Sequence, residues 1–98
     1  MKRLTIIKDD NSVGIDGKFY TIDCSSLPAN FHALQWYDNV GEIEWLGNPK
    51  PRNTPVNSLT EYQKFIDEWN AREAFLKNAV KTETAIAAAA RAANTLVY

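Results

Sequence analysis

Cys24 and His32 are the two side chains in this sequence whose types most readily perform nucleophilic and acid–base chemistry. Each is the single residue of its kind in the 98-residue chain. A thiol and an imidazole act together only within hydrogen-bond distance, in a pocket that activates the thiol, and a chain of this length rarely encloses one. Both residues lie in or beside strand-like patterns, so we interpret Cys24 as a small buried hydrophobe and His32 as a partly buried core residue. We assign no catalytic residue and expect a non-enzymatic protein.

The acidic run that starts at Asp9 has a weak similarity to a calcium-binding loop. Val13 stands where such a loop needs an oxygen ligand, and Tyr20 stands where it needs a bidentate glutamate. One histidine and one cysteine cannot supply the ligands of a zinc site, and the glycines form no phosphate-binding loop. We expect neither a metal nor a cofactor, and we interpret residues 9–14 as a β-turn with solvated carboxylates.

The composition is that of a soluble domain, with 45% hydrophobic residues, 23% charged residues and a formal net charge of -1. The lysines and arginines form no block, which argues against nucleic-acid binding. A single cysteine excludes an intramolecular disulfide and favours a reducing compartment. The N-terminus has too few apolar residues before Lys8 for a signal sequence, and Arg91 interrupts a short alanine-rich run, so we expect no membrane segment.

The dipeptide Asp16-Gly17 predicts a β-hairpin, because it lies between apolar runs and both central residues of a type I′ turn need a positive φ. If Ile15 pairs with Lys18, then Val13 lies opposite Tyr20. The shared apolar face then carries Val13, Ile15, Tyr20, Ile22 and Cys24.

A second hairpin is predicted from residues 32–37 and 42–45, joined by residues 38–41. Pairing Tyr37 with Glu42 places Trp36 opposite Ile43 and Leu34 opposite Trp45. Four apolar residues then share one face with His32, which is the alternation of a half-buried antiparallel pair. A strand over residues 4–8 should join the same sheet, in an order that the sequence does not determine.

The segment over residues 47–57 holds three prolines and no apolar period, which predicts an extended connector. Ser58 and Glu61 then match a capping box, so a helix should begin at Leu59. Its apolar stripe consists of Tyr62, Ile66, Trp69, Leu76 and Val80, widened by Phe65 and Phe75. We interpret the three tryptophans, Trp36, Trp45 and Trp69, as core residues rather than as a ligand pocket.

The sequence therefore predicts an α+β fold, with a small antiparallel sheet of hairpins packed on a C-terminal amphipathic helix and followed by an alanine-rich helical extension. We divide the chain into an α+β domain over residues 1–80 (sheet 1–46, connector 47–57, helix 58–80) and the extension over residues 81–98. Whether the helix is continuous through residues 81–84 stays open. An uninterrupted helix to Leu96 would span roughly 55 Å, more than a sheet of short strands can cover.

The extension is predicted to pack on another helix, because small side chains let helix backbones approach closely. The expected contact residues are Ile86, Ala87, Ala90, Ala93, Leu96 and Val97. A second copy or a different protein would supply that helix, giving a homo-oligomer or a hetero-complex. The alternative is an intramolecular helical hairpin with the preceding helix.

The segment from Ile15 to Trp36, IDGKFYTIDCSSLPANFHALQW, followed by GEIEW from Gly41 to Trp45, resembles small proteins of tailed bacteriophages and prophages. The resemblance covers roughly residues 13 to 70. It implies a protein of the tail or tail-fibre gene module, present in the virion or in the host cytoplasm during assembly. On this basis we expect a minor tail or tail-fibre-associated structural component or an assembly chaperone, with a tail or tail-fibre protein or a second copy as its partner. The alternative is a phage-encoded inhibitor that binds a host or defence protein.

Overall fold

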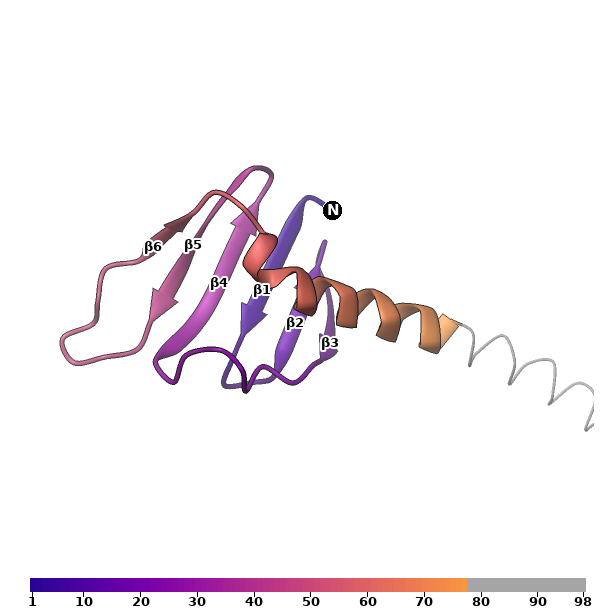
Figure 1. The fold of residues 1–98 in the computed structure, drawn as a ribbon, viewed down its shortest axis with the longest axis horizontal. Coiled ribbons are helices and arrows are strands. Elements are labelled where there is room, and N and C mark those ends of the chain that lie inside the picture. Colours follow the sequence, from indigo (N-terminus) through magenta and orange to yellow (C-terminus); the bar gives the residue numbers. More distant parts are fainter. Residues whose placement is uncertain (78–98) are drawn as a thin grey trace, which may run out of the picture.

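A computed structural model describes residues 1–77, which form one six-stranded antiparallel sheet with a helix across one face (Figure 1). The strands are β1 (Arg3–Ile7), β2 (Ser12–Ile15), β3 (Lys18–Thr21), β4 (Phe31–Tyr37), β5 (Val40–Trp45) and β6 (Thr54–Val56). A 3-10 turn, η1 (Thr60–Tyr62), leads into an α-helix over residues 63–77. The predicted α+β class is confirmed, and the alanine-rich extension lies outside the described residues.

The strand order β3-β2-β1-β4-β5-β6 places the N-terminal strand between the two hairpins. Leu4 of β1 lies opposite Ile15 on one side and Trp36 on the other, and Ile6 lies between Val13 and Leu34. Leu4 and Ile6 are both fully buried. β1 therefore joins the two hairpins into one sheet with a common apolar face.

The first hairpin has the predicted turn and register. Asp16 and Gly17 adopt φ values of 50° and 87°, and Ile15 pairs with Lys18. The Asp16 carboxylate also accepts hydrogen bonds from the backbone N–H groups of Lys2 and Arg3, at 2.8 and 2.9 Å. The turn is thus bound to the start of β1 as well as closing its own hairpin.

The second hairpin has the predicted faces but a register displaced by two residues. Tyr37 pairs with Val40 and Leu34 with Ile43, so the turn is Asp38-Asn39 rather than the four-residue loop predicted from the sequence. Asp38 adopts a φ of 62°, a conformation that aspartate tolerates better than most residues. A displacement of two residues keeps Leu34, Trp36 and Ile43 on their predicted face.

His32 does not share the face of Leu34 and Trp36, contrary to the prediction. Phe31 pairs with Trp45 and Ala33 with Glu44, so a β-bulge leaves one extra residue in β4. The bulge turns Phe31 into the core, where it is 1% exposed, and the His32 side chain remains 42% exposed. Simple alternation fails here because it cannot anticipate an inserted residue.

Part of the predicted connector forms the edge strand β6, which pairs with β5 through Pro55 opposite Glu42. The sequence of this segment shows no strand-like alternation. Proline is tolerated in it because one side of an edge strand makes no hydrogen bonds to a neighbouring strand. Beyond β6, Ser58 Oγ accepts a hydrogen bond from the Thr60 N–H at 3.2 Å. The helical segment begins as a 3-10 turn at Thr60, so the α-helix starts later than Leu59.

The core lies between the helix and the sheet face that the two hairpins share. The α-helix contributes three buried residues, Phe65, Ile66 and Trp69, and η1 contributes Tyr62. The sheet contributes residues from five strands, among them Leu4, Val13, Leu34, Ile43 and Val56. Further along the helix, Leu76 is half-buried, whereas Phe75 is 61% exposed and does not join the core as predicted.

Candidate functional site

Cys24 and His32 lie in different environments and form no catalytic pair. Cys24 is fully buried, its Sγ lies 3.2 Å from the Ile22 carbonyl oxygen, and burial raises its pKa to about 11. His32 lies on the sheet face opposite the helix, with Nδ1 3.9 Å from an Asp9 carboxylate oxygen. A thiol that stays protonated in the core is a poor nucleophile, so the interpretation of Cys24 as a structural residue is favoured by its surroundings.

The acidic run near the N-terminus is a turn whose polar groups have structural roles. Asn11 adopts a φ of 46°, and its side-chain oxygen accepts a hydrogen bond from the Cys24 N–H at 3.0 Å. Asp9 and Asp10 are exposed. Among residues 1–77, no group of histidine, cysteine, aspartate and glutamate side chains is arranged to hold a metal ion.

Two of the three tryptophans are core residues as predicted, and the third, Trp45, is only partly buried and packs against the core. Trp36 and Trp69 are each 8% exposed. Trp45 lies edge-on to Phe31 with ring centroids 5.9 Å apart, and its Nε1 donates to Thr54 Oγ1 at 2.8 Å. All three tryptophan side chains therefore contact the core or neighbouring strands.

A polar cluster around Glu73 links the helix to β3, the edge strand of the sheet. Tyr20 of β3 donates a short hydrogen bond to the Glu73 carboxylate, and Lys18 Nζ lies 3.1 Å from it. Lys77, one turn further along the helix, adds a second ion pair at 3.3 Å. The bonds from Tyr20 and then Lys18 lower the pKa of Glu73 to about 2. Beside this cluster, Trp69 Nε1 donates a hydrogen bond to the Lys18 carbonyl oxygen at 3.0 Å, which is a further contact between the helix and β3.

Glu73→Gln is expected to flatten the loss of stability in acid. Because the folded pKa of Glu73 is below its ordinary value of 4.5, the ionised carboxylate stabilises the fold above about pH 4.5, and this stabilisation disappears as the pH falls toward 2. The measurement is the urea midpoint of unfolding against pH.

The matched control is Glu61→Gln, at an exposed glutamate of η1. It should leave the acid limb of the curve as steep as in the unmodified chain. Equal flattening by both substitutions would show that general charge, and not the Glu73 cluster, governs acid stability.

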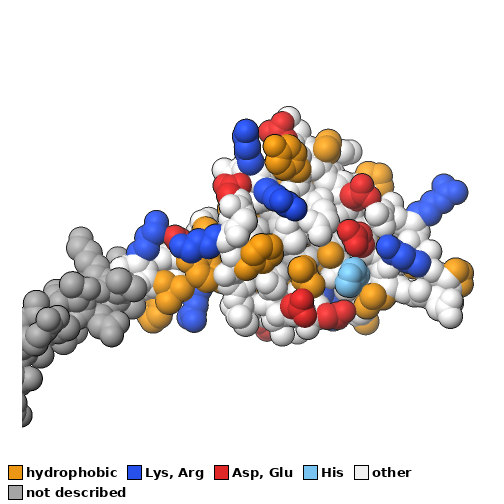
Figure 2. Space-filling view, turned by 180° about the vertical axis from the view of Figure 1, so that it is seen from behind, with side chains coloured by type: hydrophobic (Ala, Val, Ile, Leu, Met, Phe, Trp, Pro, Cys, Tyr) orange, Lys and Arg blue, Asp and Glu red, His pale blue; other side chains and the backbone are white. Residues whose placement is uncertain are grey.

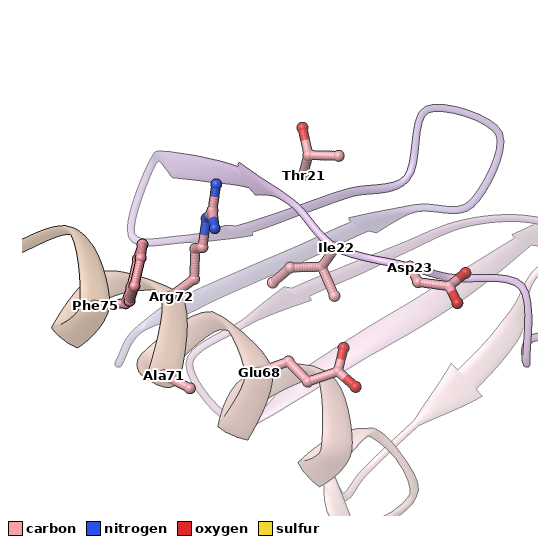
Figure 3. A pocket seen from close by; sticks show the side chains of 7 residues that line it. All are labelled: Thr21, Ile22, Asp23, Glu68, Ala71, Arg72 and Phe75. Carbon is pink, nitrogen blue, oxygen red and sulfur yellow. The ribbon is translucent and has the colours of Figure 1, made fainter.

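A groove of about 420 Å³ lies between the helix and the end of β3 (Figure 3). Its apolar surface comes from Ile22, Ala71 and Phe75, and the Arg72 guanidinium lies 5.7 Å from the Phe75 ring centroid. Thr21, Asp23 and Glu68 complete the lining. Asp23 is already engaged, since its carboxylate accepts a hydrogen bond from the Ser25 N–H at 2.9 Å. This combination of apolar and charged side chains suits a binding surface.

The sheet face opposite the helix is mixed in character (Figure 2). The Phe19 ring lies directly on Gly14, where a Cβ atom would overlap it, and Thr5 donates to the Gln35 side-chain oxygen at 3.3 Å. Figure 2 shows hydrophobic side chains scattered among charged ones on this face. It offers no continuous apolar patch, so the groove and the adjoining edge of β3 are the better candidate for binding.

The residues predicted to make the partner contact lie outside the described part of the chain. They are Ile86, Ala87, Ala90, Ala93, Leu96 and Val97. The described part of the helix, which precedes these residues in the sequence, passes beyond β3 (Figure 1).

Comparison of the chain with protein-family models, with curated proteins and with solved structures gave no match. The likeness to phage tail-module proteins therefore remains a prediction. Within residues 1–77, the helical segments are too short or too polar to cross a membrane.

The Glu73 cluster and the groove were missed by reasoning from the sequence. One signal was present, because Glu73 follows Trp69 by four residues and so lies on the apolar stripe of the helix. A carboxylate at such a position requires a polar partner on the surface against which the helix packs. The identity of that partner, in β3, depends on the strand order.

Proposed function

We propose that this chain is a non-enzymatic protein of a bacteriophage tail module, a minor tail or tail-fibre-associated component or an assembly chaperone, and that it binds its partner through its C-terminal extension. The phage assignment rests on the resemblance over residues 13 to 70. The mode of action rests on the shape of the α+β domain, which carries a helix past the edge of its own sheet (Figure 1).

The single observation that supports docking through the extension is that the described core is complete without it. The buried hydrophobic residues between Leu4 and Trp69 pack on one another, and no described helix residue after Trp69 is fully buried: Leu76 is half-buried and Phe75 is 61% exposed. The sheet ends at β3, so the domain offers the rest of the helix little surface to cover. An alanine-rich segment is only marginally helical alone in water and needs a packing partner.

Ala90→Leu is expected to weaken assembly while the α+β domain stays folded, because added bulk keeps two helix backbones apart. Light scattering on the full chain measures self-association, and co-purification with tail and tail-fibre proteins measures the hetero-complex. Truncation after Val80 should leave a soluble monomer.

The matched control is Ala74→Leu, at an exposed alanine of the described helix. It should associate like the unmodified chain. A full-length protein that is monomeric, binds no tail protein and packs residues 84–93 on its own sheet would overturn the proposal.

Mass spectrometry and cryo-microscopy of purified virions separate the remaining roles. A structural component should be present at a defined position in the tail. An assembly chaperone should be absent from virions but bound to a tail or tail-fibre protein in infected cells. Absence from both, together with a complex with a host protein, would favour the inhibitor instead.

A further inference from the structure

The outer side of β3 carries backbone groups with no partner among the described residues. Val13 pairs with Tyr20, and the Ile22 N–H donates to the Asn11 carbonyl at 2.8 Å, so these residues direct their backbone groups toward β2. Hydrogen-bonded and non-hydrogen-bonded positions alternate along an antiparallel pair. The backbone N–H and C=O groups of Phe19 and Thr21 therefore point away from β2. The N–H and C=O groups of Phe19 and Thr21 are therefore open to a further strand.

The two edges of the sheet differ in how well they resist such pairing. β6 has three residues with Pro55 at its centre, which removes a backbone donor and blunts that edge. β3 contains no proline, and its Phe19 is 49% exposed. The β3 edge is thus the one that can accept a strand.

The helix passes over the place that a strand beside β3 would occupy. Trp69 and Glu73 bond to Lys18 and Tyr20, which fixes the helix directly above β3. The helix then continues past this edge, and the groove beside Ile22 lies beneath its Ala71 and Phe75 (Figures 1 and 3). A strand at the usual spacing of about 4.8 Å from β3 would run past Thr21, the β3 residue that lines this groove, and enter the groove at that end.

A second copy of β3 is a poor occupant. Each copy carries its own helix over β3, held by the bond from Tyr20 to Glu73. In a symmetric pairing of two β3 strands, both helices would come to the same place above the paired edges. The occupant must be an extended segment with no helix packed on it.

The C-terminal end of the chain has the required composition and length. Residues 94–98 read Asn-Thr-Leu-Val-Tyr, in which β-branched and aromatic residues replace the alanines that precede them. The segment is long enough to pair along the whole of β3. A continuous helix over residues 78–94, one of the two alternatives that the sequence leaves open, would place residue 94 roughly 25 Å beyond Lys77, out of reach of its own β3.

We propose that residues 94–98 of one copy pair as a strand with the β3 edge of a second copy, beneath that copy's helix, so that Leu96 and Val97 make a strand contact in place of the helix contact expected from the sequence. This inference rests on the proposed function and identifies the surface that receives the extension. The contact joins two different surfaces, so reciprocal exchange between two copies closes a dimer, whereas one-way donation builds rings or chains.

Amide hydrogen exchange on the full chain tests the pairing directly. In the associated protein the outward amides of Phe19 and Thr21 should be protected, and dilution to monomer should remove the protection. The inward amide of Tyr20, which belongs to the β2–β3 ladder, serves as the internal reference and should stay protected throughout. Unprotected Phe19 and Thr21 amides in the associated protein would overturn the inference. Protection that persists in the monomer would also overturn it, because residues 94–98 of the same chain would then be paired with β3.

Thr21→Pro removes one outward N–H and should weaken association about tenfold or more. Thr21→Val keeps that N–H and is the matched control. If Thr21→Pro disturbs the fold, Val97→Pro removes a donor from the incoming strand far from the core, with Val97→Ile as its control. If association survives both proline variants but is lost in Ala90→Leu, the strand pairing is wrong and the proposed function stands. If the unmodified chain does not associate with itself, both self-association proposals fail.

Discussion

Trp36→Ala is expected to lower the free energy of unfolding by about 3 to 5 kcal/mol, as large-to-small changes of buried aromatic residues do. Trp36 is 8% exposed and lies on the apolar face of β4, opposite Leu4 of β1 and Gly41 of β5. Its removal would leave a cavity at the centre of the sheet, where neighbouring strands hold the backbone and limit collapse. Urea unfolding followed by circular dichroism measures the loss.

Tyr37→Ala is the matched control, since Tyr37 follows Trp36 on the same strand and is 61% exposed. It should change the free energy of unfolding by well under 1 kcal/mol, as is usual for surface substitutions. Equal midpoints for the Trp36 variant and the unmodified chain would place Trp36 outside the core.

Gly41→Ala is expected to cost about 1 to 3 kcal/mol, the usual range for overpacking. A Cβ atom at Gly41 would lie 2.5 Å from the Gln35 carbonyl oxygen and 2.9 Å from the Trp36 Cα. Both neighbours are backbone atoms of β4, so relief requires the two strands to move apart. The thermal midpoint and the urea midpoint should both fall.

Gly14→Ala is the comparison that separates crowding by backbone from crowding by a side chain. The three atoms nearest to a Cβ atom at Gly14 would all belong to the Phe19 ring, which is half exposed and can rotate away. Its cost should be clearly smaller than that of Gly41→Ala. The reverse order would mean that Phe19 is held more firmly on the sheet than its exposure indicates.

Phe75 illustrates how the lining of a groove can escape detection in a sequence. Phe75 belongs to the apolar pattern of the helix and was expected in the core, yet it lines an open groove because the sheet ends at β3. Periodicity reports which face of a helix is apolar, and it does not report how far the opposing surface extends. The groove and the outward backbone groups of Phe19 and Thr21 both arise from that ending of the sheet.

Local chemistry was sufficient wherever neighbouring residues decided the outcome. Asp16-Gly17 determined the first hairpin and its register, because few other residues adopt two successive positive φ values. Alternation determined the faces of Leu34, Trp36 and Ile43, and the helical stripe identified Tyr62, Ile66 and Trp69 as core residues. These features depend on contacts within a turn, a strand or a helix.

The tertiary structure decided everything that required distant segments to meet. The position of β1 between the hairpins, the pairing of Pro55 in β6, and the partnership of Glu73 with Lys18 and Tyr20 join residues far apart in the chain. The bulge at His32 has the same origin, because the extra residue allows Phe31 to reach the core and Ala33 to keep its place beside Ile7 of β1. Pairing energy between strands depends on which strands become neighbours, and no local pattern in the sequence encodes that choice.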